Sequence, residues 1–270
     1  MEHPLITLLT DFGEDDFFVA SLKGAILSIN PLVQIVDITH RVPSFAVRRA
    51  GFILFSCYRF FPTHTIFLSV VDPGVGSGRR ILLVETKKYF FIAPDNGLLT
   101  LVLDQEQVDQ IREVTNPKYF LSEESRTFEA RDKMAPVAAW LSRGIPADEF
   151  GQSVSKYEKM DIPKLRIREN AIEGCFLYQD KFGNLITNIP NEMMGLFMKN
   201  TGQAKLTLAA GRKEVVDFHR SYSDAIRGEL LLIGGSVGLI EVSAREESAS
   251  KKLKAKPGDL IKISIKRKIS

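Results

Sequence analysis

The amino-acid sequence predicts an α/β amino-terminal domain, with a mostly parallel sheet and flanking helices, followed by a small carboxy-terminal β-barrel domain. In the first part of the chain, apolar β-branched runs alternate with segments whose apolar residues recur at helical spacing, as in β-α-β units. Beyond Ala171 the pattern changes to short apolar runs with little helical periodicity, which favours a small barrel or sandwich. The polar and basic stretch at residues 152–170 contains the boundary, so we predict domains at residues 1–160 and 171–270, with residues 161–170 as a linker.

The first domain opens with a predicted strand at residues 5–9 and continues as an alternation of helices and strands. Helical spacing predicts helices at residues 19–29 and 47–59, and β-branched runs predict strands at residues 34–38 and 65–71. Residues 81–86 and 89–93 are predicted to form a hairpin added to the sheet. Residues 98–103 are predicted to begin a helix and residues 135–142 to form another.

The second domain is predicted to consist of short strands. Apolar runs indicate them at residues 174–179, 185–189, 204–208, 230–233, 239–242 and 260–265. Such a series of short strands is typical of small barrels.

Composition excludes several classes of protein. The net charge of +3 is small and the basic residues are dispersed, so we expect no nucleic-acid partner. Cys57 and Cys175 each lie in an apolar run, as reduced core cysteines of a cytoplasmic protein do. Acidic residues follow directly after the first apolar run, which argues against a signal peptide, and no apolar stretch is long enough to span a membrane. We therefore expect a soluble cytoplasmic protein.

The stretch from residue 65 to residue 80 carries the strongest indication of chemistry. A buried strand ends at Asp72, and a loop with three glycines then leads to Arg79. Open α/β sheets present ligand-binding groups at such strand ends. The loop is short enough to fold Asp72 onto Arg79, either as a reactive pair or as a structural ion pair that fixes the turn. The glycine spacing fits neither a P-loop nor a dinucleotide fingerprint, so we expect no phosphate site here.

Other polar residues follow predicted strands. Asp11 and Asn96 lie at strand ends, where they suit ribose hydroxyls or the edge of a base, although both sequences are also ordinary turns. In the second domain, Phe182 between Asp180 and Asn184 is either part of a hairpin loop or a stacking platform for a flat ligand. The four histidines show no spacing of a zinc site, so we expect no metal.

Taken together, these segments resemble the S-adenosylmethionine hydroxide adenosyltransferases, relatives of the fluorinase and chlorinase enzymes. The matching stretches occur in the family's order and cover nearly the whole chain: LTDFG at residues 9–13, VDITH at 36–40, VVDPGVG at 70–76 with Arg79, APDNGLLT at 93–100, FGNLITNI at 182–189 and GSVGLIEV at 235–242. The resemblance implies an α/β domain, a β-barrel domain and a homotrimer whose active sites lie between subunits. It also implies attack at the ribose C5′ carbon of S-adenosylmethionine, which gives adenosine and methionine when water is the nucleophile, without a cofactor.

The resemblance further implies roles for individual residues. Asp11 would hold the ribose hydroxyls, and Phe45 would line the nucleoside pocket. In the second domain, the adenosine would be held by Asn184, Ser236, Glu241 and the backbone at Ala244. Asp180 and Phe182 would complete the pocket. Asp72 and Arg79 match two of the three residues associated with water activation.

The third position differs from the family. Hydroxide-transferring members carry a His where this chain has Glu129, within the stretch FEARD at residues 128–132. Glu129 could act as a general base with a pKa raised by burial and by Asp72, pair with Arg79 and leave Asp72 as the base, or point away from the site. We favour water attack assisted by a carboxylate.

Two further functions remain open. The chain could be an attenuated trimer that binds S-adenosylmethionine or adenosine without turnover. Halide transfer is less favoured, because carboxylates at positions 72 and 129 would repel a halide at low dielectric.

Overall fold

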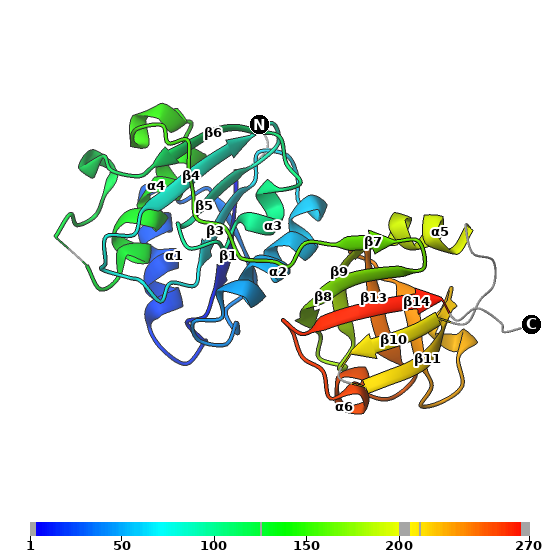
Figure 1. Ribbon diagram of the computed structural model, residues 1–270. Helices are drawn as coiled ribbons and strands as arrows, with labels where there is room; N and C mark the ends of the chain where they lie inside the picture. Colours follow the sequence, from blue (N-terminus) through cyan, green and yellow to red (C-terminus); the bar gives the residue numbers. More distant parts are fainter. Residues whose placement is uncertain (1–3, 125, 200–205, 211, 266–270) are drawn as a thin grey trace, which may run out of the picture. The chain divides into compact units, whose positions relative to one another are not determined.

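The computed structural model describes residues 4–124, 126–199, 206–210 and 212–265. The chain divides into two compact units, Met1–Met160 and Asp161–Ser270 (Figure 1). Residues 204 and 205 of the predicted strand at 204–208 lie outside the described residues.

The first unit is built on a six-stranded sheet with strand order β2-β1-β3-β5-β4-β6 (Figure 1). Its strands are β1 (Leu5–Thr10), β2 (Gln34–Thr39), β3 (Ile66–Val70), β4 (Ile81–Thr86), β5 (Phe90–Pro94) and β6 (Val108–Glu113). The pairs β1–β2, β1–β3 and β3–β5 are parallel, whereas β4 runs antiparallel to both β5 and β6. The predicted α/β class and the predicted hairpin are therefore confirmed.

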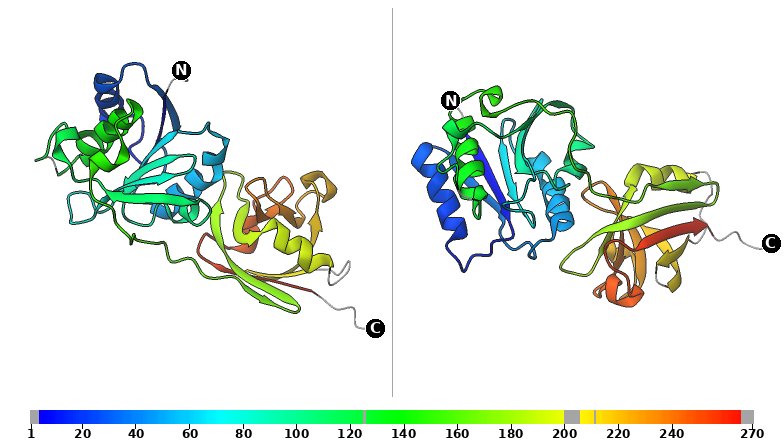
Figure 2. Two further views of the ribbon diagram at one scale, coloured as in Figure 1. Left: turned by 90° about the horizontal axis from the view of Figure 1, so that it is seen from above. Right: turned by 60° about the vertical axis from the view of Figure 1, so that its left-hand side comes forward.

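Helices cover both faces of this sheet. They are α1 (Phe18–Ile29), α2 (Val47–Cys57), α3 (Thr100–Leu103) and α4 (Ala135–Ser142). Buried residues of α1 and α4 pack on one face of the sheet, and those of α2 and α3 pack on the other. Figure 2 shows α1 and α4 together on one side of the sheet and α2 on the opposite side. Short 3₁₀ turns at Tyr58–Phe60, Pro117–Tyr119 and Ala147–Phe150 and a π-helical turn, η3 (Ala130–Met134), complete the unit.

The parallel strands place two chemistry-bearing loops side by side. Thr10 at the end of β1 is in register with Val70 at the end of β3. The loops that begin with Asp11 and Asp72 therefore leave the sheet at the same edge, next to one another.

The second unit is a curled sheet with strand order β14-β10-β11-β12-β13-β9-β8-β7. Its strands are β7 (Arg166–Arg168), β8 (Ala171–Gln179), β9 (Leu185–Pro190), β10 (Leu206–Ala210), β11 (Arg212–His219), β12 (Leu230–Gly234), β13 (Leu239–Ala244) and β14 (Leu260–Ile265). A further antiparallel pairing of β14 with β8 closes the sheet on itself (Figure 1). The predicted barrel is therefore present, and an apolar core that includes Phe176, Leu232 and Ile263 fills it.

Some elements were not expected from the sequence. They are β6, β7, β11, α5 (Asn191–Lys199), α6 (Ala249–Leu253), a 3₁₀ turn at Tyr222–Asp224 and η3. In β6 only Ile111 is buried and the other residues are mostly polar, so its apolar signal is weak. Helix α5 is short and contains a glycine, and the fully buried side chain of Met194 anchors it to the core. No helix in the described part of the chain combines the length and the apolar character needed to cross a membrane.

Candidate active site

Asp72 and Arg79 meet across the loop that follows β3. The Nε atom of Arg79 donates to Oδ2 of Asp72 at 2.7 Å, and a terminal nitrogen of Arg79 lies 2.6 Å from the same oxygen. The N–H of Gly74 donates to the other oxygen of Asp72 at 3.1 Å. Because only 6% of the Asp72 side chain and 10% of the Arg79 side chain are exposed, this pair is shielded from solvent, unlike an ordinary surface ion pair.

Glu129 joins this pair from the other side. It lies at the start of η3, and its Oε2 atom accepts a short hydrogen bond from the terminal nitrogen of Arg79. Its Oε1 atom accepts from Nζ of Lys133, one helical turn further on, at 2.6 Å. The four side chains, which we call the Asp72 cluster, therefore alternate in charge: Asp72, Arg79, Glu129 and Lys133.

The cations decide the ionisation of Glu129. Burial acts to raise the pKa of its carboxyl group, but the hydrogen bonds and charges of Lys133 and Arg79 outweigh burial and lower the pKa. If Glu129 were the general base, its pKa would have to be raised, which is the opposite direction. Among the three arrangements considered for Glu129, the structure contains the one in which it pairs with Arg79.

Aromatic packing fixes the backbone beside Glu129. The ring of Phe128 lies edge-on to those of Phe12 and Phe18, with centroids 5.7 Å and 5.3 Å away. Since Phe12 follows Asp11 and Phe128 precedes Glu129, these contacts hold the β1 loop against the start of η3.

Asp11, Phe45 and Asn96 lie around the same end of the sheet. Oδ2 of Asp11 accepts the N–H of Phe45 at 2.8 Å, and Phe45 has a left-handed backbone with φ of 66° and a ring that is 68% exposed. The amide nitrogen of Asn96 donates to the carbonyl oxygen of Val71 at 2.9 Å, directly before Asp72. The structure thus places these residues at the edge of the sheet where the Asp72 loop begins. The Asn96 amide is already used, because it binds the backbone directly before Asp72.

The predicted residues of the second unit gather around a single cavity of about 850 Å³, which we call the Asp180 cavity. Its lining includes every residue that the sequence proposed there: Asp180, Phe182, Asn184, Ser236, Glu241 and Ala244. A volume of this size is in the range of small-molecule sites. The six predicted residues come from the β8–β9 turn, the β12–β13 turn and β13.

Hydrogen bonds make one wall of the Asp180 cavity rigid. Asp180 accepts the backbone N–H groups of Phe182 and Asn184, each at 2.9 Å, and the side-chain amide of Asn184 at 2.8 Å. The ring of Phe182 stays 65% exposed at the rim, so one face is open to a flat ligand.

A second wall contains Tyr222, which the sequence analysis missed. The hydroxyl group of Tyr222 donates to Oε1 of Glu241 at 2.5 Å, and that of Ser243 donates to the same oxygen at 2.7 Å. Burial, together with the neighbouring Glu241 carboxylate, raises the pKa of the Tyr222 hydroxyl group, which therefore stays protonated as a donor.

Two residues of the candidate site, Tyr222 and Lys133, were missed in the sequence. Tyr222 lies outside every matched stretch, and Lys133 differs from a surface lysine only through its spacing of four residues from Glu129.

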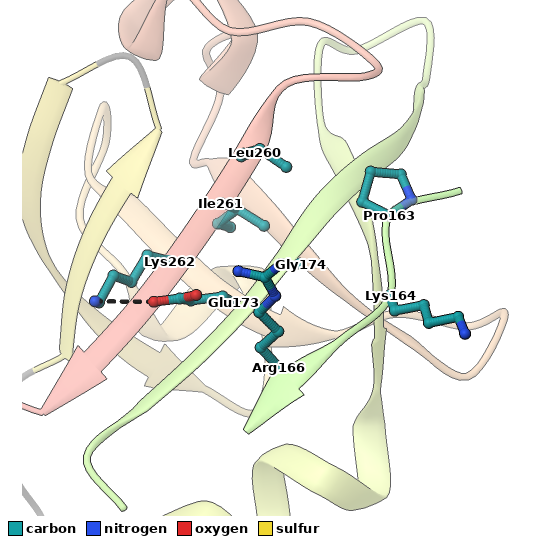
Figure 3. A pocket seen from close by; sticks show the side chains of 8 residues that line it. All are labelled: Pro163, Lys164, Arg166, Glu173, Gly174, Leu260, Ile261 and Lys262. Carbon is teal, nitrogen blue, oxygen red and sulfur yellow. Dashed lines mark hydrogen bonds and ion pairs between the residues drawn. The ribbon is translucent and has the colours of Figure 1, made fainter. Parts of the chain in front are cut away.

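Another hollow, of about 560 Å³, lies between β7, β8 and β14 (Figure 3). Glu173 and Lys262, opposite one another on the paired strands β8 and β14, form an ion pair of 3.0 Å in its lining, which also includes Lys164 and Arg166. None of the predicted site residues lines this hollow, so we place the candidate site at the Asp72 cluster and the Asp180 cavity.

Comparison with known proteins shows which family this chain resembles. The model of the SAM hydroxide adenosyltransferase N-terminal domain matches residues 6–151, and that of the C-terminal domain matches residues 174–262. The (R)-S-adenosyl-L-methionine hydrolase of Methanocaldococcus jannaschii is 31% identical over 268 residues, which cover 96% of this chain and 95% of that one. The hydrolase of the same name from Thermus thermophilus is 32% identical over 260 residues, covering 94% and 96%.

Two further similarities extend the comparison. A fluorinase from an Actinoplanes species is 31% identical over 214 residues, covering 69% of this chain and 72% of that enzyme. The crystal structure of an uncharacterized conserved protein from Thermotoga maritima matches with a TM-score of 0.88 at 37% identity, covering 96% of this chain and 99% of that one.

Proposed function

Because this chain belongs to the SAM hydroxide adenosyltransferase family, we propose that it cleaves S-adenosylmethionine by attack of water at the ribose C5′ carbon. The products are adenosine and methionine. The observation that carries the proposal is the shielded Asp72 cluster at the end of β3, in a chain whose full-length relatives are named as S-adenosylmethionine hydrolases.

The reaction is a direct displacement. The oxygen of water forms a bond to C5′, the bond from C5′ to sulfur breaks, and its electron pair stays on sulfur, which becomes the neutral thioether of methionine. One proton leaves the attacking water. No acid is needed for the leaving group, because a sulfonium departs as a neutral molecule, so the protein must align the water, remove its proton and exclude competing solvent.

We assign proton removal to Asp72. One of its oxygens is held by Arg79 and the other by the N–H of Gly74, so the carboxylate is fixed in orientation and shielded from bulk water. Arg79 places positive charge beside the oxygen of the water as it loses its proton, and so favours its anionic, nucleophilic form. This arrangement uses Asp72 as the base without requiring a histidine.

Glu129 has a different role in this proposal. Its lowered pKa makes it a weak base, and its contact with Arg79 offsets part of the positive charge available to the attacking oxygen. Lys133 supplies a second cation to the same carboxylate and so limits this loss. We therefore describe Glu129 and Lys133 as positioning residues for Arg79.

We propose that the nucleoside is bound by both groups of predicted residues. Asp11 has one carboxylate oxygen fixed by the Phe45 N–H and would use the other for the ribose hydroxyls. Phe45 and Phe182, both largely exposed, would cover the faces of the nucleoside. In the Asp180 cavity, polar groups would read the edge of the adenine: Asn184, Ser236, Glu241 and the backbone of Ala244.

We also propose that the working form is a homotrimer, with each site formed by the amino-terminal domain of one subunit and the carboxy-terminal domain of a neighbour. The support is the resemblance of this chain to the family, together with the placement of the Asp72 cluster and the Asp180 cavity in different compact units. S-adenosylmethionine is then the substrate shared between subunits, and the displacement itself calls for no additional cofactor.

One observation favours a second candidate function, a protein that holds S-adenosylmethionine or adenosine without turning it over. Arg79 is bound by two carboxylates, so its charge is less available to a developing anion than in a site with a neutral histidine. The same two carboxylates disfavour halide entry.

The deciding experiment is incubation of the purified protein with S-adenosylmethionine in chloride-free buffer, with chromatography of adenosine and methionine. Asp72→Asn is the test variant. Asp95→Asn is a matched control, because Asp95 also pairs with an arginine of the same loop, Arg80, at 2.5 Å but lies outside the cluster. We expect the wild type and the control to form adenosine and methionine in equal amounts and at similar rates. In Asp72→Asn the rate of product formation should fall by at least about a hundredfold. Intact S-adenosylmethionine with clear calorimetric binding would support the holding function instead.

A further inference from the structure

Three potential metal ligands converge in the second unit, away from the Asp72 cluster. They are Asp217 and His219 on β11 and Glu229 just before β12, and one ligand atom from each lies within 4.8 Å of the others. All three side chains are half-buried. The proposed displacement reaction uses none of them.

The sheet itself brings these residues together. Strands β11 and β12 pair in parallel, with Asp217 opposite Leu231 and His219 opposite Ile233. Alternate residues of a strand share one face, so Asp217 and His219 project to the same side of β11. Glu229 lies just before β12 and two residues before Leu231, so it shares a face of the sheet with Leu231 and hence with Asp217. The cluster therefore links two neighbouring strands.

The polar atoms of this group leave coordination positions open. Within the described part of the chain, the Nε2 atom of His219 is buried without a hydrogen-bond partner. A buried nitrogen without a partner is costly, and a bound cation would satisfy it. Oε2 of Glu229 accepts the N–H of Ile226 at 2.8 Å, which fixes this carboxylate while Oε1 remains for a ligand.

From this geometry we propose that Asp217, His219 and Glu229 bind a divalent transition-metal ion of the zinc class. Imidazole nitrogen and carboxylate oxygen are both ligands that zinc accepts, and a water would complete the tetrahedron. Magnesium is disfavoured, because it prefers oxygen ligands alone. The spacing of the histidines in the sequence gave no indication of such a site, since only strand pairing brings Glu229 next to Asp217 and His219.

The position of this ion has a consequence for ligand binding. The segment between β11 and β12 carries Tyr222 and Ser223, which line the Asp180 cavity. An ion that ties His219 to Glu229 joins the two ends of this segment. It therefore steadies the wall that holds Glu241 through the Tyr222 hydroxyl group.

The test is calorimetric titration of the chelator-treated, full-length protein with zinc chloride, followed by thermal unfolding with and without zinc. We expect one ion per chain and a rise in the unfolding temperature with zinc concentration. His219→Ala and Asp217→Asn should each weaken binding by at least about tenfold and remove most of the thermal shift. Cobalt substitution should give the visible absorption of a tetrahedral site in the wild type and lose it in both variants.

Two matched controls accompany these variants. Glu246→Gln removes an exposed carboxylate from the turn that follows β13. His64→Asn removes an exposed histidine from the first unit, at a position with a left-handed backbone that Asn tolerates. Both should bind zinc like the wild type. The proposal is overturned if the wild type binds no zinc at one ion per chain, or if Asp217→Asn, folded by circular dichroism, binds as tightly as the wild type.

Discussion

At the scale of single residues, the proposed chemistry depends on how four charges share one shielded space. Asp72, Arg79, Glu129 and Lys133 alternate in sign, so each carboxylate has a cation and the cluster is neutral as a whole. Removing any member leaves a partner that burial alone would disfavour in its charged form. In the proposed mechanism, the side chain at position 129 therefore controls how much of the Arg79 charge reaches the attacking water.

Glu129→His should raise the turnover of S-adenosylmethionine. A neutral imidazole frees Arg79 from its second carboxylate and restores a group with a reference pKa of about 6.5, so we expect an increase of roughly tenfold near neutral pH. The measurement is the initial rate of adenosine formation at saturating substrate. Glu129→Gln, which removes the charge but keeps the shape, is the companion variant. A fall in both variants would mean that Glu129 is itself the base.

Lys133→Met should destabilise the fold in a pH-dependent way. The pKa of Glu129 is lowered in the folded protein, so the stabilisation from its ion pairs is present above the ordinary pKa of Glu and is lost as pH falls through the lowered value. We expect a loss of about 1–3 kcal/mol in the free energy of unfolding at neutral pH, and a smaller loss near the acid end of the accessible range. Urea unfolding at a series of pH values measures both.

The control for this variant is Lys23→Met. Lys23 pairs with Asp37 at 2.5 Å, but both side chains are about one-third exposed. Removing an exposed pair should change the free energy of unfolding by less than about 1 kcal/mol. Equal losses in the two variants would show that Lys133 acts as an ordinary surface lysine.

At the scale of elements, the loop between β3 and β4 is as important as the residues that it carries. Gly76 has φ of +77°, and a Cβ atom at this position would lie 2.6 Å from the carbonyl oxygen of Arg126. The glycine therefore lets the loop pack against the segment that leads to Glu129. This close approach allows Arg79 to reach Asp72 and Glu129 at once.

Gly76→Ala should disturb that approach, because a side chain there is strained by both its backbone angle and its contact. We expect a destabilisation of about 1–3 kcal/mol and a marked loss of turnover. Gly78→Ala is the matched control in the same loop, since nothing lies within 4 Å of its added Cβ and its φ is not in the left-handed range. Thermal unfolding and adenosine formation, measured on both variants, check the prediction, and similar behaviour of the two would contradict it.

The sequence predicted those elements whose apolar pattern is strong. Strands β1 and β3 and helix α4 were predicted within a residue or two, because each is a nearly unbroken run of buried, mostly apolar residues. The meeting of Asp72 and Arg79 followed from the length of their loop. The contact of Lys133 with Glu129 was not predicted, because it depends on where η3 begins. Tyr222 was missed because its partner, Glu241, is distant in the chain and reaches it only through the fold.

At the scale of the whole molecule, the proposed site draws on two separately folded units. The Asp72 cluster belongs to Met1–Met160, and the Asp180 cavity belongs to Asp161–Ser270. If neighbouring subunits of a trimer each provide one of these groups, a defect in one group can be complemented by a subunit whose defect is in the other. A cyclic assembly makes this prediction quantitative.

Mixing Asp72→Asn with Phe182→Ala subunits should restore activity. In a ring of three, every mixed trimer has one site with an intact Asp72 from one subunit and an intact Phe182 from its neighbour, so equal mixing should regain roughly a quarter of the wild-type activity. The two variants are co-refolded or co-expressed and assayed for adenosine at low substrate concentration. Activity no greater than the mean of the separate variants would place each site within a single subunit.

The closure of the barrel by β14 has a consequence for synthesis of the chain. Every strand of the first unit is complete by Glu113 and its last α-helix by Ser142, so that unit can fold while the rest of the chain is still being made. The second unit cannot, because β8 and β10 both pair with β14, whose residues 260–265 are translated last among its strands. Until they leave the ribosome, β8 and β10 present unpaired strand edges, and newly made chains are most exposed to aggregation during that interval.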